Sequence, residues 1–478
     1  MDGLVLSHPE QLERLWRVCP EAVDVSVLAG DPCFDRMLAA RPYRDRFRRA
    51  LGVRRGQRLV VLNSTWNPEG FFGSGSGSGN RGRDADNDND NSGDRDDLFP
   101  SLLPRLTAEL PADDYRFAAV LHPNIWYGHG PGQVRAWLDR ARRAGLTLID
   151  PAHAWRQALL AADAVIGDFG AVSYYAAALG LPVSLAATGE QRLDPETPLA
   201  AFVRDAPRID PHGPLRAQVE QLFAGHRRTA APTSSAASAA TSPPVNSAMD
   251  PATPSTAPAE FVTSSPGSSA ALLRRHFYAL MDLPEPASPA LLEPLPLPPY
   301  DPPRRTAPLR VLTRVDGADV VIERSTELAY DADGDVHLAV HEETRDPGTL
   351  ESADVIVGDG APDDPRLGGP EVWAAEVLQR HAHCSVAAYV GGPDVCTVRS
   401  REHGLFRLSA GPGADADPAA YASSLYAWLT AGGSVPPGGV TLHVHVAGGI
   451  HPVTVEPFPA PLDGGTGPLR RGPLRRDA

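Results

Sequence analysis

Residues 163–186 read DAVIGDFGAVSYYAAALGLPVSLA and contain two strand-like runs separated by a helical one. The first run, 163–168, has the apolar composition of a buried strand. Residues 172–180 have helical spacing and end at a glycine, and 181–186 return to a strand pattern. A strand, a helix and a second strand of these lengths predict two parallel strands joined by a crossover helix.

The same alternation extends toward the N-terminus. Strand-like runs are followed by runs with helical periodicity, and the 132–145 run ends at Gly145, a residue typical of a helix C-terminus. The strand-like runs are 59–63, 117–123 and 146–150, and the helical runs are 98–110, 132–145 and 154–162. We therefore predict an α/β, Rossmann-like domain with a parallel sheet.

Changes in composition divide the chain into an α/β domain, linkers and a second domain. The second domain has strand-like runs, an Asp316-Gly317 hairpin signal and two helical runs, which predict an α+β or α/β fold. The expected segments are the first domain at 1–227 with a disordered insertion at 73–97, an Ala/Ser/Pro linker at 228–268, a helix at 269–283 docked on the first domain, a Pro-rich linker at 284–307, the second domain at 308–460 and a flexible tail at 461–478.

The net charge and the cysteine content argue against certain partners and compartments for this protein. A formal net charge of -15 argues against nucleic acid as a partner, because phosphate backbones are bound by basic surfaces. The 4 cysteines are scattered, which favours a reducing cytoplasm over a disulfide framework. No signal peptide and no apolar run of about 18 residues is visible. We expect a cytoplasmic protein and leave open peripheral attachment to the inner face of the membrane.

Three loops follow strands of the predicted sheet and carry polar or small residues. In an open parallel sheet, ligands bind beyond the carboxyl ends of the strands. The loops read NSTWNP at 63–68, HPNIW at 122–126 and GDFGAV at 167–172. The third loop opens a helix with small residues, so its main-chain amides are uncovered at the positive end of the helix dipole, where a phosphate binds well.

Each of these loops has a structural alternative. The small residues at 170 and 171 suit a tight strand-to-helix turn equally well. Asp168 would cap the helix or orient a ribose or base. His122 would donate to a diphosphate or stack as a loop histidine, and the hydroxyls of Ser64 and Thr65 would bind phosphate or close a turn.

Four segments together resemble the CDP-glycerol glycerophosphotransferase family, which builds teichoic-acid-type polymers. They are GDPCFD at 30–35, STWN at 64–67, HP at 122–123 and GDFGA at 167–171, and they occur in the family's order within residues 20–190. Three departures are visible: Asn67 stands where the family has arginine, Gly170-Ala171 stands where it has a Ser-Ser pair, and Tyr174 or Tyr175 replaces the acidic residue one helical turn further on. The Gly-Ala pair is closer to the loop of UDP-N-acetylglucosamine 2-epimerases.

The resemblance implies that the first domain is the nucleotide-binding half of a GT-B transferase. Such a protein transfers glycerol phosphate or a sugar from a nucleotide-diphosphate donor, CDP-glycerol or a nucleotide sugar, to a polyol-phosphate or glycan acceptor. The residues expected to bind the diphosphate are Ser64, Thr65, His122, Asp168, Gly170, Ala171 and Val172. No resident cofactor is expected. A non-catalytic nucleotide-binding or interaction module and an epimerase-like enzyme are the alternatives.

The resemblance leaves the catalytic residues unassigned. The family's N-terminal acceptor half, which supplies a catalytic histidine, has no counterpart in this sequence, so we expect either a shortened gene product or a domain that has lost that half. His443 and His445 alternate along one predicted strand, as on a half-exposed face, and we predict no metal site there. The absence of a phosphate-binding GxxxxGK[ST] loop argues against a P-loop NTPase.

Overall fold

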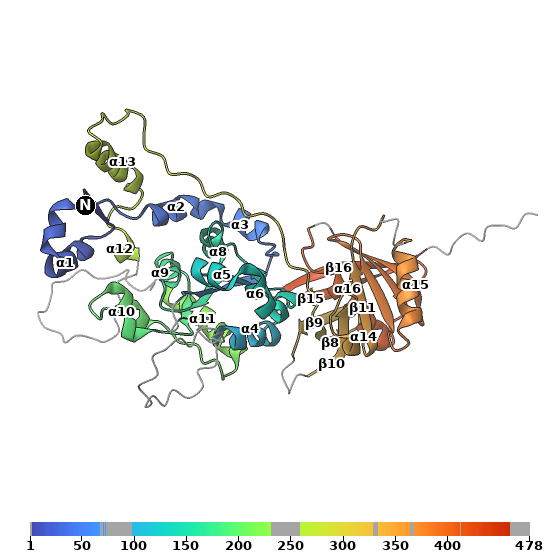
Figure 1. Cartoon of the computed structure of the whole chain (residues 1–478). Coiled ribbons are helices and arrows are strands. Elements are labelled where there is room, and N and C mark those ends of the chain that lie inside the picture. Colours follow the sequence, from blue (N-terminus) through green and yellow to red (C-terminus); the bar gives the residue numbers. More distant parts are fainter. Residues whose placement is uncertain are drawn as a thin grey trace, which may run out of the picture.

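The computed structural model describes residues 2–66, 70, 72, 98–230, 259–327, 333–363, 368–411 and 413–458. The predicted insertion at 73–97 and tail at 461–478 lie outside these residues. The described part forms an α/β domain followed by a β-rich domain (Figure 1). Within that part, no helix combines the length and the apolar character needed to cross a bilayer.

Among the described residues, the first domain is built on a five-stranded, entirely parallel sheet of order β5-β4-β3-β6-β7. The predicted α/β class with a parallel sheet is confirmed. β3 is central, with β4 and β5 on one side and β6 and β7 on the other, so the direction of winding reverses between β3 and β6. The strands are β3 (Arg58–Ser64), β4 (Tyr115–Leu121), β5 (Thr147–Leu148), β6 (Ala164–Gly167) and β7 (Val183–Leu185).

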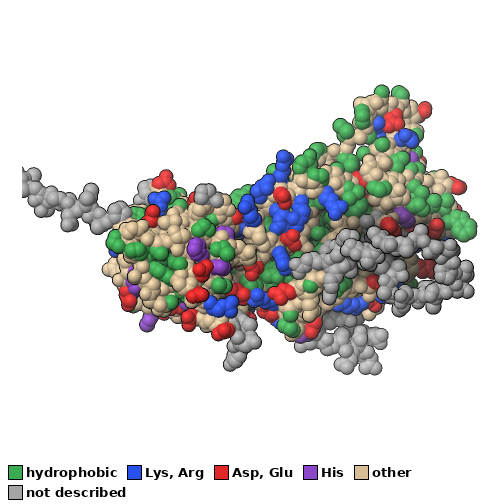
Figure 2. Space-filling model, turned by 180° about the vertical axis from the view of Figure 1, so that it is seen from behind, with side chains coloured by type: hydrophobic (Ala, Val, Ile, Leu, Met, Phe, Trp, Pro, Cys, Tyr) green, Lys and Arg blue, Asp and Glu red, His purple; other side chains and the backbone are tan. Residues whose placement is uncertain are grey.

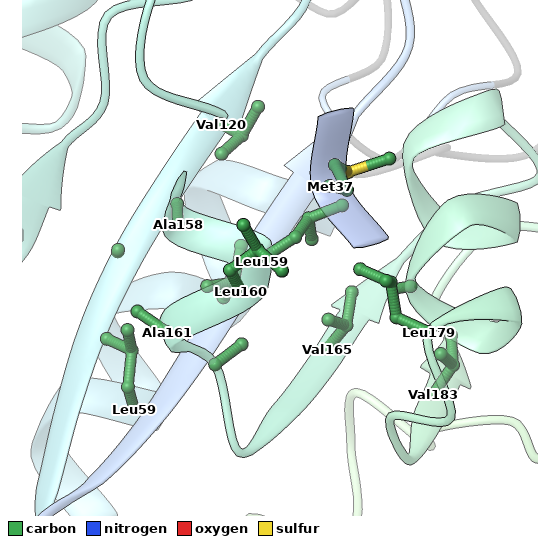
Figure 3. Packing of buried hydrophobic residues seen from close by; sticks show 14 of the residues in the cluster. Met37, Leu59, Val120, Ala158, Leu159, Leu160, Ala161, Val165, Leu179 and Val183 are labelled. Carbon is green, nitrogen blue, oxygen red and sulfur yellow. The ribbon is translucent and has the colours of Figure 1, made fainter. Parts of the chain in front are cut away.

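Helices cover both faces of this sheet, because alternate residues of each strand point to opposite faces and both sets are apolar. Leu59, Val120 and Val165 pack against helices on one face (Figure 3), and Val60, Leu62 and Ile166 pack against helices on the other. The first face is covered by α2 (Pro32–Ala40), α3 (Arg44–Ala50), α8 (Trp155–Ala161) and α9 (Ala171–Ala178); the second by α4 (Leu98–Glu109), α5 (Pro123–His129), α6 (Pro131–Trp137), α7 (Asp139–Arg143) and α11 (Leu215–Ala230).

Short elements flank the sheet. β1 (Leu4–Leu6) and β2 (Ser26–Leu28) form a separate parallel pair around α1 (Pro9–Val18). Further short helices are η1 (Pro20–Val25), η2 (Arg41–Tyr43), η3 (Glu190–Arg192) and α10 (Pro198–Asp205).

The linker predicted at 228–268 needs correction at both ends. At its start, α11 continues to residue 230. At its end, α12 (Ala259–Val262) is helical, Val262 is buried in the core, and the Ser264 amide donates to the Ser7 carbonyl at 2.9 Å. The sequence signal for this packed segment was Val262, an apolar residue between Phe261 and Thr263 in a stretch otherwise rich in Ser, Thr and Pro. Residues 231–258 of the predicted linker lie outside the described part.

The following segment runs along the first domain toward the second (Figure 1). α13 (Ser269–Leu280) is attached at its start by the buried Asp35 carboxylate, which accepts from the amides of Gly267 at 2.7 Å and Ser269 at 3.0 Å. The Pro-rich stretch has no regular elements, yet the Pro296 carbonyl accepts from Gln157 Nε2 at 2.9 Å. This stretch therefore lies against the first domain.

The second domain is a closed barrel of nine strands in the described residues, in the order β10-β11-β12-β13-β14-β16-β15-β9-β8. Most neighbours are antiparallel, and β10-β11, β11-β12 and β9-β15 are parallel. The predicted hairpin at Asp316-Gly317 joins β8 to β9. The strands are β8 (Leu309–Asp316), β9 (Asp319–Ser325), β10 (Asp335–His341), β11 (Val355–Asp359), β12 (Val386–Val390), β13 (Val395–Ser400), β14 (Gly404–Ala410), β15 (Val440–Val446) and β16 (Gly449–Pro457).

Helix α16 (Pro418–Thr430) fills the barrel. It contacts β8, β9, β11, β12, β13 and β15, and its side chains are buried around nearly the whole helix. Trp428 anchors its end by donating from Nε1 to the Gly317 carbonyl at 2.9 Å. Outside the barrel, α15 (Pro370–Arg380) packs on β12 and β13, and α14 (Pro347–Glu351) precedes β11.

A buried ion cluster joins the two domains. Arg324, 2 % exposed, donates to both oxygens of Asp113 in the first domain, at 2.8 and 2.6 Å, and to Asp417 at 2.8 Å. The positive charge of Arg324 lowers the pKa of the Asp417 carboxyl well below its usual range, despite the opposing effect of burial. Arg216 adds a second cross-domain pair with Glu323, at 2.7 Å.

Replacing Arg324 by alanine should destabilise the protein by about 3–5 kcal/mol, because the buried Asp113 carboxylate and the partly exposed Asp417 carboxylate lose their shared cation. Urea denaturation followed by circular dichroism measures the change. Arg407→Ala on an exposed part of β14 is the matched control and should stay within about 0.5 kcal/mol of the wild type. A loss below about 1 kcal/mol in Arg324→Ala would show that the cluster does not hold the junction.

Candidate functional site

The three loops singled out from the sequence meet at one edge of the parallel sheet. They follow the carboxyl ends of β4, β3 and β6, which are neighbours in that order. The reversal of strand order between β3 and β6 leaves a crevice at this edge, because the flanking helices cover opposite faces. Thr65, His122 and Gly170 therefore lie around one site, although they are far apart in the sequence.

The carboxylate of Asp168 ties two of these loops together. Asp168 is fully buried, and its Oδ2 accepts from the Thr65 amide at 2.7 Å and lies 3.3 Å from Ser64 Oγ. Its Oδ1 accepts from the Gly170 amide at 3.0 Å. Buried carboxylates are stable when main-chain N–H groups donate to them. Asp168 thus holds the loops in register and is covered by them.

A second buried pair lies just beneath. Asn63 on β3 and Ser173 on α9 hydrogen bond through Asn63 Nδ2 and Ser173 Oγ, 3.1 Å apart. Gly167 makes this contact possible: a Cβ there would lie 2.2 Å from Asn63 Oδ1 and 2.4 Å from Ser173 Oγ. The Ser64 hydroxyl accepts from the Phe72 amide at 2.6 Å. The buried Ser64 side chain therefore stabilises the conformation of its own loop.

Large side chains near the turn point away from the crevice. Phe169 is buried in the core, and its ring lies under Gly189. Tyr175 donates its hydroxyl to Asp31 Oδ2 at 2.6 Å, and Tyr174 packs edge-on against Phe202 with ring centroids 5.6 Å apart. The turn before α9 is therefore not plugged by the aromatic residues that follow it.

The N-terminus of α9 offers unpaired main-chain amides. The first bond of the helix is donated by Tyr174 to the Gly170 carbonyl, and no described residue accepts from the amides of Ala171, Val172 or Ser173. Ala171 is exposed and Val172 half-buried. No side chain caps this end, so the dipole of α9 and these amides favour an anion in front of it.

His122 approaches from the neighbouring strand as the first residue before α5. Its Nδ1 accepts from the Asn124 amide at 3.1 Å, which places the ring proton of the neutral form on Nε2. Partial burial lowers the pKa of His122 from its ordinary value. The side chain is thus a neutral donor at pH 7, with the Trp66 ring beside it at a centroid distance of 6.4 Å.

A cavity of about 320 Å³ opens between these groups. This volume is at the lower end of the range for ligand pockets, roughly 300–1,000 Å³. The lining of the cavity includes Ser64, Thr65, His122, Gly170, Ala171 and Val172 from the predicted set, together with Asn63, Val120, Leu121, Pro123, Pro151 and Trp155.

The structure divides the predicted site residues by position. Thr65, His122, Ala171 and Val172 line the cavity with partly accessible surface, whereas Ser64 and Asp168 are buried and position the loops. Sequence reasoning missed Asn63 and Trp155. Asn63 ends an otherwise apolar strand, and that polar residue was the available signal; Trp155 resembled any apolar residue of an amphipathic helix.

Metal-binding clusters were also sought among the described residues. No group of three or more His, Cys, Asp or Glu side chains among them is arranged to hold a metal ion. His443 and His445 both lie near Asp319, with His445 Nε2 2.8 Å from Asp319 Oδ1. The hydrogen bond from His445 is the main cause that lowers the pKa of the exposed Asp319 carboxyl.

Comparisons with known proteins give distant similarities. No protein-family model matches the sequence, and no curated protein matches it. Among solved structures, wall teichoic acid polymerase TagF with CDPG aligns at a TM-score of 0.32 and 16% identity, over 48% of this chain and 49% of that one. TagF alone gives a TM-score of 0.30 at 15% identity, over 48% and 50%.

A second kind of protein also aligns. Anabaena Alr3699/HepE in complex with UDP-glucose has a TM-score of 0.28 and 12% identity, over 59% of this chain and 64% of that one. Compared with the TagF structures, the chain spans about half of their length. Similarity at this level does not assign a substrate or an activity, so any function must be argued from the site itself.

Gly167→Ala tests the packing beneath the site. Its Cβ would overlap Asn63 and Ser173, so we expect a loss of about 1–3 kcal/mol in the free energy of unfolding. Gly128→Ala in α5 is the matched control, since nothing lies within 4 Å of its Cβ; it should be neutral or stabilising by up to about 1 kcal/mol. Equal stabilities of both variants in a urea titration would mean that the Asn63–Ser173 contact is dispensable.

Proposed function

We propose that the first domain binds a nucleotide diphosphate, with the phosphates in front of α9. One observation carries this proposal: the amides of Ala171, Val172 and Ser173 are unpaired at the N-terminus of a helix that opens onto the cavity between β3 and β6. Unpaired N–H groups at a helix N-terminus and the helix dipole stabilise a multiply charged anion without a basic side chain, and Ala171 and Val172 of this turn line the cavity.

His122 supports the same function from the other side of the cavity. The hydrogen bond from the Asn124 amide orients the ring, so that Nε2–H is the group left to donate. A diphosphate placed between α9 and His122 would receive donors from two directions. Thr65 adds a hydroxyl on the third loop, and Trp155 supplies an apolar wall.

Within this proposal, the site would act as the donor half of a GT-B type transferase. The amides and His122 would stabilise charge that develops on the nucleotide leaving group when glycerol phosphate or a sugar passes to an acceptor hydroxyl. CDP-glycerol and nucleotide sugars are the donors to test, and a polyol phosphate or a glycan is the proposed acceptor. A cytoplasmic location, with or without peripheral membrane attachment, is part of this proposal.

A non-catalytic nucleotide-binding module is the second candidate, and the lining of the cavity favours it. Among the described lining residues, His122 has the only titratable side chain, and Asp168 is buried beneath the loops and does not line the cavity. Because His122 would donate a hydrogen bond to the diphosphate in this proposal, a residue outside this cavity would have to act as the general base. Nucleotide binding without turnover would support this candidate.

Ala171→Pro should weaken binding of CDP-glycerol while leaving the fold intact. Proline is well tolerated at the first position of a helix, and the extended conformation of Gly170 suits a residue before proline. The change removes one amide donor, which should cost about 1–3 kcal/mol of binding free energy in calorimetry. Ala171→Val adds similar bulk and keeps the amide. Equal weakening by both variants would attribute the effect to bulk.

The pH dependence of binding tests His122. An anion beside the ring raises the pKa of His122 in the complex above its value in the free protein, so affinity should rise as the pH falls from 7 to 5. CDP-glycerol suits this titration, because its diphosphate is esterified at both ends and keeps its charge. In His122→Gln the rise should disappear. A rise of the same size in this variant would exclude His122 from the phosphate site.

A further inference from the structure

A second cavity lies at the opposite, amino-terminal edge of the parallel sheet. It has a volume of about 630 Å³ and is bounded by the segment before β3, the start of β4, the Pro-rich stretch and the mouth of the barrel. Arginine side chains gather at the junction of the two domains (Figure 2). The arginines that line the cavity are Arg49, Arg54, Arg116, Arg304, Arg305 and Arg324.

Arg116 is buried in the cavity wall without a carboxylate partner. It is 9% exposed, its Nε donates to the Leu51 carbonyl at 3.0 Å, and an Nη atom lies 3.5 Å from Thr147 Oγ1. Gly52 permits this position, because a Cβ there would lie 3.1 Å from the guanidinium. Neither hydrogen bond neutralises the charge.

Arg305 is held in the same way on the linker side. Its Nε donates to the Ala144 carbonyl at 3.2 Å and an Nη atom to the Ala112 carbonyl at 3.0 Å. Gly145 makes room for it, since a Cβ there would lie 3.1 Å from the guanidinium. Among the described residues, no carboxylate lies within 4.0 Å of Arg305 or Arg116.

Three other arginines of the cavity have carboxylate partners: Arg324 is buried, Arg54 is half-buried and Arg304 is exposed. Arg324 pairs with Asp113 and Asp417, and Arg304 with Glu343 and Asp359. Arg54 is 3.9 Å from Asp417, whose charge Arg324 already shares. Among the less exposed arginines of the cavity, Arg116 and Arg305 are therefore the two without a direct carboxylate partner.

Burial is the main cause that lowers the pKa of both guanidiniums. The charge of Arg305 adds to this effect at Arg116, whose pKa falls to about 10, whereas the charges of Asp113 and Asp417 oppose it at Arg305. Carbonyl acceptors satisfy N–H groups but leave two like charges close together in a poorly solvated space. Such an arrangement is unfavourable unless an anion compensates it.

We propose that this junction cavity binds a small phosphate-bearing anion with at least two negative charges, held between Arg116 and Arg305. Two guanidiniums without a direct carboxylate partner match a dianion better than a monocarboxylate, and their planar donors suit phosphate oxygens. The volume exceeds that of inorganic phosphate and accommodates a diphosphate or a phosphate ester. The site is separate from the proposed nucleotide site, since the two lie at opposite edges of the sheet.

Binding there would join three parts of the chain. The lining comes from the first domain, the Pro-rich stretch and the barrel, so an anion in the cavity would bridge all of them. A ligand that binds the folded junction alone raises the unfolding temperature in proportion to its occupancy. Inorganic diphosphate should therefore stabilise the junction, and less so at high salt.

The test uses the full chain in phosphate-free buffer, with inorganic diphosphate as the probe and inorganic phosphate and acetate for comparison. Calorimetry and thermal unfolding should show binding of diphosphate, weaker binding of phosphate and none of acetate. Arg305→Gln should weaken diphosphate binding at least tenfold, and Arg54→Gln, on the first-domain wall of the cavity, by a smaller factor. Arg407→Gln, on the exposed face of β14, should bind as the wild type does.

Two further readouts separate the alternatives. In the absence of anion, Arg305→Gln should unfold at the same temperature as the wild type or higher, because the substitution removes one of two like charges in the cavity. A loss of diphosphate binding in this variant can then not be attributed to a folding defect. Ala171→Pro should retain the binding that Arg305→Gln loses. No diphosphate binding, or binding lost in Ala171→Pro but retained in Arg305→Gln and Arg54→Gln, would overturn the junction site without deciding the function of the other.

Discussion

The site depends on one buried carboxylate. Asp168 accepts from the amides of Thr65 and Gly170 and so fixes the loop after β3 against the turn into α9. With the Thr65 and Gly170 amides already paired, the next amides of the helix have no acceptor among the described residues, and Ala171 and Val172 line the cavity. The geometry in front of α9 is therefore set by hydrogen bonds beneath it, and a ligand would bind amides whose positions are already determined.

The parallel sheet could be predicted from sequence because its signals are local. The apolar runs of β3, β4 and β6 and the glycines at 145 and 180 mark each strand and helix end. The predicted loops also meet in space, since the carboxyl ends of parallel strands share an edge. The roles of individual side chains could not be predicted in this way. Ser64 and Asp168 look accessible in a loop sequence and are buried in the fold.

The architecture of the second domain, in contrast, could not be predicted from the sequence. Its strands and both main helices could be recognised individually, but their closure into a barrel depends on pairings between distant segments, such as β8 with β10 and β9 with β15. The enclosure of α16 was equally hidden, although its alanines, serines and large apolar residues leave almost no charged face. Likewise, the junction cavity is built from arginines of four separate segments, and their meeting has no local signal.

The amides in front of α9 can be observed directly. In a ¹H–¹⁵N correlation spectrum of the deuterated full chain, titration with CDP-glycerol should shift the amide signals of Ala171, Val172 and Ser173 downfield together, with a common saturation point. The Thr65 and Gly170 amides, already bonded to Asp168, should move less. If these three signals stay in place while the ligand binds, or if no signal moves, the site in front of α9 is not a phosphate site.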